Sequence, residues 1–199
     1  GDWLTELLRQ CAHPGGAAIC GAMLWYPDET IQHAGIVTGL GGYAGHSHKY
    51  KKKGGSGYLF RTSTVQDFSG VTGACLLVKT AVYDEMHGLD EQFAVAFNDV
   101  DFCLRVRDAG YRIAWTPYAE LIHYESKSRG GDEKDPVKAA RFAAEQQRLY
   151  TIHGKENILD DPYYNPNLTR DREDFSESDD LRRLKEGRVT VRFRGGTLQ

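Results

Sequence analysis

Two carboxylates stand close together in the run Asn98-Asp99-Val100-Asp101. A carboxylate that faces a cleft can act as a general base. Acidic residues in the first turn of a helix are also stabilised by the helix dipole, and Arg105 follows Asp101 by four residues, as in an ordinary helix ion pair. Asp99 is the better catalytic candidate, because it precedes the body of the expected helix and its side chain can point into a cleft.

A histidine and a polar loop form a second candidate. His123 follows a strand-like segment, and a neutral imidazole is a suitable ligand for manganese or zinc. Ser126, Lys127 and Arg129 come next and offer a hydroxyl and two cations that suit a lid over a diphosphate. The alternatives are a histidine with ordinary hydrogen bonds and a solvated loop. We expect Asp99 and His123 to open into a common hollow at one edge of the sheet.

Small residues form a third candidate at Thr72 and Gly73, where a strand is expected to begin. Such residues let a ligand approach the backbone closely, although tight packing explains them equally well. His46 and His48 could chelate a metal, but a pair of histidines on a glycine-rich segment is weak support for that. No glycine-rich phosphate loop ending in Gly-Lys-Ser/Thr occurs.

The elements that must position these residues alternate between helix and strand. The periodicity and the turn residues predict an α/β domain with a mixed sheet. Asn98 is expected to cap its helix, and Asp135 followed by Pro136 is typical of another helix start. The glycine-rich segment 39–57 is expected to be a mobile loop. The predicted helices span 2–11, 80–86, 98–110 and 136–152, and the predicted strands span 17–26, 31–37, 71–78, 111–116 and 119–124.

Composition restricts the function classes. The chain has 199 residues, 27% of them charged, and a formal net charge of −3, so no basic field favours nucleic acid as a partner. No apolar run approaches the roughly 20 residues that a membrane span needs. Four widely spaced cysteines indicate a reducing compartment rather than a zinc site. We expect residues 1–155 to form one domain and the polar segment 156–199 to be a strap or linker.

Taken in chain order, these sequence features resemble those of glycosyltransferase family 2, whose members have the GT-A fold. The resemblance is greatest to bacterial members that build surface polysaccharides. The similarity is carried by YPDETIQHAGIV at 26–37, by the segment 71–105 that contains VTGACLLVKT and FNDVDFCLR, by AGYRIAWTPYAELIHYESKSRG at 109–130 and by DPYYNPNL at 161–168. The resemblance implies that Asp99 is the catalytic base, with Asn98 beside it where many members have glutamate. It also implies that Thr72 and Gly73 line the donor-sugar and acceptor pocket, and that His123 contacts a metal.

The resemblance further implies that the chain is the acceptor-side half of a partial, Rossmann-like GT-A domain. The N-terminal nucleotide-binding strands and the metal-binding DxD motif would lie before residue 1, so this fragment is expected to be inactive alone. The complete enzyme would transfer a sugar, with inversion, from a UDP- or dTDP-sugar to a glycan or lipid-linked acceptor, using Mn²⁺ or Mg²⁺. A cytoplasmic location at the inner membrane surface is expected, and a homodimer is left open. The alternative is a non-catalytic module that binds carbohydrate or acts as a scaffold; a metal-dependent hydrolase ranks lower.

Overall fold

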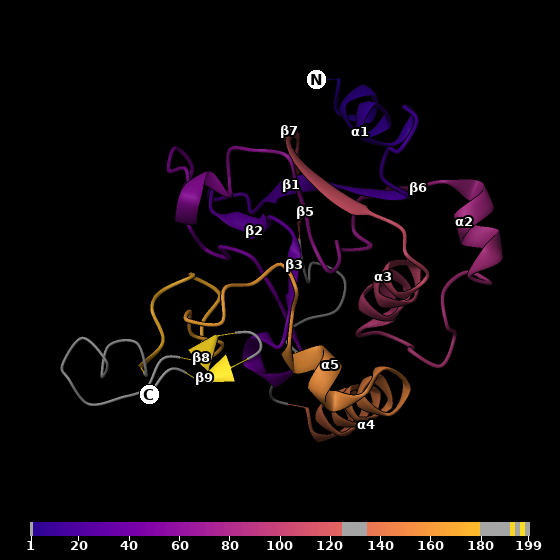
Figure 1. Cartoon of the computed structure of the whole chain (residues 1–199), viewed down its shortest axis with the longest axis vertical. Helices are drawn as coiled ribbons and strands as arrows, with labels where there is room; N and C mark the ends of the chain where they lie inside the picture. Colours follow the sequence, from indigo (N-terminus) through magenta and orange to yellow (C-terminus); the bar gives the residue numbers. More distant parts are fainter. Residues whose placement is uncertain (1, 125–134, 180–191, 194–195, 198–199) are drawn as a thin grey trace.

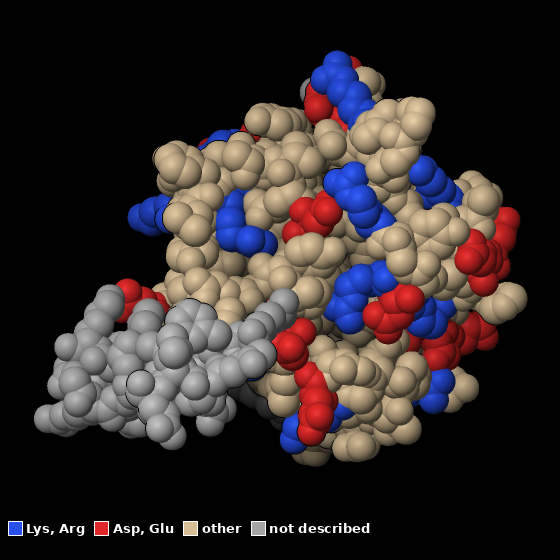
Figure 2. Space-filling view, in the orientation of Figure 1, with Lys and Arg blue, Asp and Glu red and all other residues tan. Residues whose placement is uncertain are grey.

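The computed structural model describes residues 2–124, 135–179, 192–193 and 196–197, and it confirms an α/β fold built on a mixed, curled sheet (Figure 1). In this view the α-helices lie above the sheet, to its right and below it, and the C-terminal elements lie together at the lower end of the molecule (Figure 1). Within the described residues no helix is both long and apolar enough to cross a membrane. Figure 2 shows lysine, arginine, aspartate and glutamate side chains interspersed over one face.

The central strand of the sheet is β1 (Ile19–Trp25), which is parallel to β7 (Ile113–Ile122). On its other side, β6 (Leu76–Val78) pairs with the first half of β1 and β2 (Ile31–His33) with its end, both antiparallel. A short strand, β5 (Gln66–Asp67), completes the sheet beside β7. The carboxyl ends of β1 and β7 therefore meet at one edge, where ligands bind in many open α/β sheets.

Pro117 does not divide two strands, as the sequence predicted, but lies in a bulge of β7. Ala22 of β1 pairs with Thr116, and the next residue, Met23, pairs with Glu120. Three residues therefore loop out of the ladder, which accommodates a proline that has no N–H to donate. The strand continues beyond the bulge and positions the residue that follows it, His123.

Five α-helices occur in the described residues, and the four predicted helices all form close to their expected limits. The cap of the long helix is confirmed, because the Asp135 side chain accepts a hydrogen bond from the Val137 N–H and Pro136 occupies the first turn. Asn98, by contrast, is the first helical residue, and Phe97 takes the cap position in a left-handed conformation. The helices are α1 (Trp3–Cys11), α2 (Thr80–Glu85), α3 (Asn98–Asp108), α4 (Pro136–His153) and α5 (Lys155–Leu159).

Residues 31–60 fold more extensively than the sequence indicated. The expected strand 31–37 is broken at Gly35, whose positive φ of 96° turns the chain and where a Cβ would meet the Phe68 ring at 2.5 Å. The mobile loop predicted at 39–57 is wrong, because this segment contains regular elements and buries Ser47 and His48. The elements are β3 (Ile36–Thr38), η1 (Leu40–Gly42), β4 (Ala44–His46) and η2 (Tyr58–Phe60).

The segment after α5 packs on the main core. Tyr164, Leu168 and Phe175 belong to the same buried cluster as Trp115 of β7. The buried Asp161 carboxylate accepts hydrogen bonds from the backbone and the hydroxyl of Thr38. The boundary at residue 155 and the strap or linker at 156–199 stay predictions, while these contacts hold residues 161–175 against the core. A short hairpin, β8 (Arg192–Phe193) and β9 (Gly196–Thr197), follows near the C-terminus.

Candidate active site around Asp99

Asp99 lies in the first turn of α3, and its carboxylate is held by backbone donors. Its Oδ2 accepts a hydrogen bond of 2.8 Å from the Gly73 N–H, and its Oδ1 accepts one of 2.9 Å from the Val100 N–H. The Asn98 side chain accepts the Asp99 N–H at 2.8 Å. These contacts fix the direction of the carboxylate, and half-burial leaves it accessible from one side.

That accessible side faces a cavity of about 480 Å³, within the range of small-molecule sites. An aromatic wall is formed by Tyr43, Phe97 and Phe142, whose rings pack edge-to-face or tilted with centroids 5.1–5.5 Å apart. The rest of the lining mixes aliphatic residues and glycines with polar side chains of both charges. The charged residues and histidine among the lining are His46, Lys49, Asp99, Asp171, Arg172 and Glu173.

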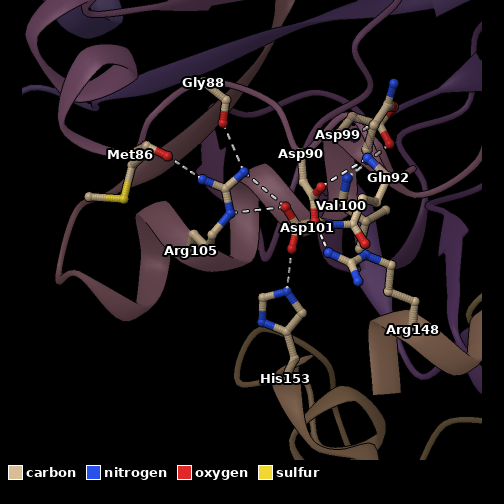
Figure 3. A network of polar contacts seen from close by, with 11 residues as sticks. Met86, Gly88, Asp90, Gln92, Asp99, Val100, Asp101, Arg105, Arg148 and His153 are labelled. Atoms are coloured by element: carbon tan, nitrogen blue, oxygen red, sulfur yellow. Dashed lines mark hydrogen bonds and ion pairs between the residues drawn. The ribbon is translucent and has the colours of Figure 1, made fainter. Parts of the chain in front are cut away.

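Asp101, the second carboxylate of the pair, has a structural role. It is 1% exposed and accepts hydrogen bonds from Arg105 Nε at 2.9 Å and from His153 Nε2 at 2.8 Å. Arg105 also donates to the carbonyls of Met86 and Gly88, so the network ties α3 to the turn after α2 and to the end of α4 (Figure 3). In Figure 3 the carboxylate of Asp101 points into this network and Asp99 lies apart from it.

Thr72 and Gly73 lie in a turn before β6 and not in the long strand predicted for 71–78. The turn brings the Gly73 N–H to Asp99, and it brings the Thr72 N–H to His33 Nε2 at 3.4 Å. A Cβ on residue 73 would make ordinary contact with the Asp99 side chain at 3.5 Å. Glycine at position 73 therefore leaves room beside the Asp99 carboxylate, and the Gly73 N–H orients that carboxylate.

His123 comes directly after β7 at the carboxyl end of the parallel pair, and its N–H donates to the Trp25 carbonyl at 2.9 Å. Its Nδ1 is buried, and within the described part of the chain it has no hydrogen-bond partner. His123 is not among the described residues that line the Asp99 cavity, so the expected common hollow stays a prediction. A buried histidine, His33, accepts the Thr72 N–H beside Gly73 and lies close enough to His123 for that residue to affect its pKa.

His33 is fully buried and bonds to His46, with 2.9 Å between their Nδ1 atoms. His33 Nε2 accepts the N–H groups of Gly35 and Thr72, so its Nδ1 must carry the proton and donate it to His46. Burial, together with the nearby His46 and His123, holds the pKa of His33 well below its usual value. His33 is therefore neutral and fixes the tautomer of His46 at the cavity wall.

Sequence reasoning missed this histidine pair. It considered His46 only as a chelating partner of His48, but the two side chains have different surroundings. His48 stacks on Phe175, with centroids 4.2 Å apart, and its Nε2 accepts the Tyr58 N–H. The strand period could have shown that His33 and Ile31 share a face, but nothing local indicated which residue would meet His33.

A resident metal is only partly accommodated by these side chains. The unpartnered, buried Nδ1 of His123 fits one ligand position. The described residues hold no group of three histidine, cysteine or acidic side chains that could bind a metal ion. Ser126, Lys127 and Arg129, the predicted lid residues, lie outside the described residues, as does the rest of Glu125–Gly130.

Comparison with known proteins gives three informative relatives. The chain is 47% identical over 175 residues to the uncharacterized protein y4gI of Sinorhizobium fredii, covering 87% of this chain and 19% of that protein. It is 35% identical over 169 residues to the O-antigen biosynthesis protein RfbC of Myxococcus xanthus, covering 84% of this chain and 13% of RfbC. It is 32% identical over 80 residues to the N-acetylglucosaminyl-diphospho-decaprenol L-rhamnosyltransferase of Mycobacterium tuberculosis, covering 40% of this chain and 24% of that protein.

The names of the second and third relatives indicate a glycosyltransferase-like family. No family model matches the chain. The chain spans less than a quarter of the length of each of these three relatives. The activity, substrates and partners of the whole protein are therefore proposals.

Proposed function

We propose that this chain is the acceptor-side part of an inverting family 2 glycosyltransferase with a GT-A fold, in which Asp99 is the catalytic base. The observation that carries the proposal is the Asp99 carboxylate, oriented by the Gly73 N–H at the wall of a cavity with aromatic and polar sides. The relatives named for O-antigen biosynthesis and rhamnosyl transfer support the same class. The donor would be a UDP- or dTDP-sugar and the acceptor a glycan or lipid-linked sugar.

In this proposal the acceptor hydroxyl enters the cavity and donates a hydrogen bond to Asp99. Its oxygen attacks the anomeric carbon of the donor from the side opposite the diphosphate. The bond from that carbon to the diphosphate oxygen breaks, and the hydroxyl proton passes to the carboxylate. A carboxylate is a weak base, so the transfer comes late in the reaction and positioning contributes more than basicity. The Gly73 N–H supplies part of that positioning.

A divalent Mn²⁺ or Mg²⁺ ion stays part of the proposal, with His123 as one ligand and the others supplied from outside the described residues. Such an ion would stabilise the negative charge of the departing diphosphate. Lys127 and Arg129 are proposed to contact the same diphosphate, and Ser126 to hydrogen-bond to it. With a lipid-linked acceptor the complete protein would work at the cytoplasmic surface of the inner membrane.

The test uses the full-length parent protein and measures sugar transfer from UDP- and dTDP-sugars to a lipid-linked acceptor. Asp99→Asn keeps the shape of the side chain and removes the base, so turnover should fall about 100-fold or more. Asp108→Asn is the matched control, because Asp108 ends the same helix and its side chain is 59% exposed. Near-normal turnover by Asp99→Asn would exclude Asp99 from the role. Glycan binding by the parent protein without any donor-dependent transfer would favour the non-catalytic alternative.

A further inference from the structure

A projecting turn, η2, carries two exposed apolar side chains that no buried cluster uses. Leu59 is 75% exposed and Phe60 is 67% exposed. Both residues have positive φ, at 46° and 62°, a conformation that non-glycine residues adopt rarely. The fold therefore keeps two neighbouring apolar side chains in solvent in a disfavoured backbone conformation.

Hydrogen bonds to neighbouring segments hold the η2 turn in place. The Tyr58 N–H donates to His48 Nε2 at 3.0 Å, and Thr62 Oγ1 donates to the Gly55 carbonyl at 2.8 Å. Tyr118 of β7, which is 61% exposed, reaches the Ser63 carbonyl with its hydroxyl at 3.4 Å. Tyr118 therefore lies beside the turn that carries Leu59 and Phe60, and these three exposed residues are named here the η2 patch.

Cations adjoin the η2 patch. From Ile31 to Gln66 the chain contains four lysines and one arginine and no acidic residue, although its overall charge is −3. A Cβ on residue 55, next to the turn, would meet the Lys51 side chain at 2.9 Å. Lys53 is paired with Glu120 at 2.6 Å, and Lys52 acts on Asp28 and lowers its pKa, after larger contributions from Thr30 hydrogen bonds. Lys51 therefore lies beside the turn, and Lys52 follows it with an exposed side chain near Asp28.

We propose that the η2 patch docks on the surface of an anionic lipid bilayer. Apolar and aromatic side chains at a protruding tip, flanked by lysines, suit the headgroup boundary, where the apolar groups enter and the cations meet lipid phosphates. A protein partner fits less well, because protein interfaces are depleted in lysine. In Figure 1 the η2 turn lies at the edge of the molecule opposite α2 and α3, and in Figure 2 the same edge carries lysine or arginine side chains beside uncharged surface.

One lysine of the same run, Lys49, belongs to the Asp99 cavity. Lys49 lines the cavity, and its ammonium lies 5.3 Å from the ring centroid of Tyr50, just before Lys51. The docking proposal does not depend on sugar transfer, so its failure would leave the proposed function untouched.

The test is co-sedimentation of this chain with vesicles made of equal parts phosphatidylcholine and phosphatidylglycerol. The chain should bind these vesicles, bind phosphatidylcholine vesicles less, and detach as salt rises. Leu59→Glu with Phe60→Glu should weaken binding by at least about tenfold, because two apolar contacts are lost. Lys51→Gln with Lys52→Gln should weaken it by about 25-fold, or about fivefold for each lysine near an anionic surface.

Matched controls lie on the helices at the other end of the molecule. Val137→Glu changes a side chain of α4 that is 77% exposed, and Lys138→Gln with Lys155→Gln removes the same charge as the lysine pair. Both controls should bind like the parent chain. Circular dichroism should show that every variant is folded, as expected for surface positions.

Three outcomes would overturn the docking proposal. The first is no binding to the anionic vesicles by the unchanged chain. The second is equal loss of binding in the controls and in the η2 variants. The third is a dimer in sedimentation velocity that only the Leu59→Glu, Phe60→Glu variant dissociates, because the patch would then be an interface between copies.

Discussion

Replacing Asp101 by asparagine should destabilise the fold far more than the same change at Asp99. The Asp101 carboxylate is 1% exposed and bonds to Arg105 and His153, so Asp101→Asn leaves a guanidinium without its counter-ion. Loss of one partner of a buried ion pair costs about 3–5 kcal/mol. The Arg105 side chain is 26% exposed and can be partly resolvated, so the lower end, about 3 kcal/mol, is expected.

Asp99→Asn removes no buried ion pair. An asparagine carbonyl can still accept the Gly73 N–H, so the free energy of unfolding should change by less than about 1 kcal/mol. Thermal unfolding followed by circular dichroism measures the difference directly. For a domain of this size about 3 kcal/mol corresponds to a fall of about 6–12 °C in Tm. Equal Tm values for the two variants would refute the assignment of one carboxylate to structure and the other to chemistry.

Three further predictions concern pH, the cavity and the nucleotide. Burial lowers the pKa of His33 well below its usual value and the pKa of His48 to about 4, so the fold favours their neutral forms. The free energy of unfolding should be highest above a pH of about 6.5 and should fall as the pH drops toward 4, because the unfolded chain then binds more protons than the folded one. Equal free energies of unfolding at pH 7 and pH 5, measured by urea titration, would contradict this. Phe142→Ala should raise the acceptor KM of the full-length protein about fivefold or more with a smaller change in kcat. An unchanged KM would show that the aromatic wall does not contribute to acceptor binding. The isolated chain should bind UDP- or dTDP-sugars weakly or not at all with manganese present; tight binding in calorimetry would refute the expectation that the nucleotide site lies elsewhere.

Local signals were sufficient for much of the framework. Asp135, Pro136 and Gly154 define the limits of α4 because capping and backbone freedom act within a few residues. Pro117 misled the strand prediction, since a bulge in a parallel pair depends on β1, which lies far away in sequence.

The segment 39–57 could not be predicted because long-range contacts order it. Its glycines were interpreted as a sign of mobility, but Gly39 and Gly42 adopt positive φ in a turn that lies against residues of α4 and α5. The Glu173 carboxylate accepts the His46 N–H at 2.7 Å from 127 residues away. The sequence around His46 does not indicate such a distant partner, and the histidine pair at the candidate site was missed for the same reason.

The candidate site itself was predicted in part. Thr72, Gly73 and Asp99 were each singled out, and the turn before β6 places Gly73 against Asp99. The Asp99 cavity does not include His123 among its described lining, whereas His46, which bonds to the buried His33, does line it. Sequence spacing indicated which residue types could react, whereas their relative placement followed from packing.

A structure of the full-length protein with an acceptor bound tests the central claim most directly. The reacting hydroxyl should lie in the Asp99 cavity, about 2.6–3.2 Å from a carboxylate oxygen, with the Gly73 N–H still bonded to Oδ2. An acceptor bound elsewhere, with Asp99 contacting only protein groups, would contradict the account.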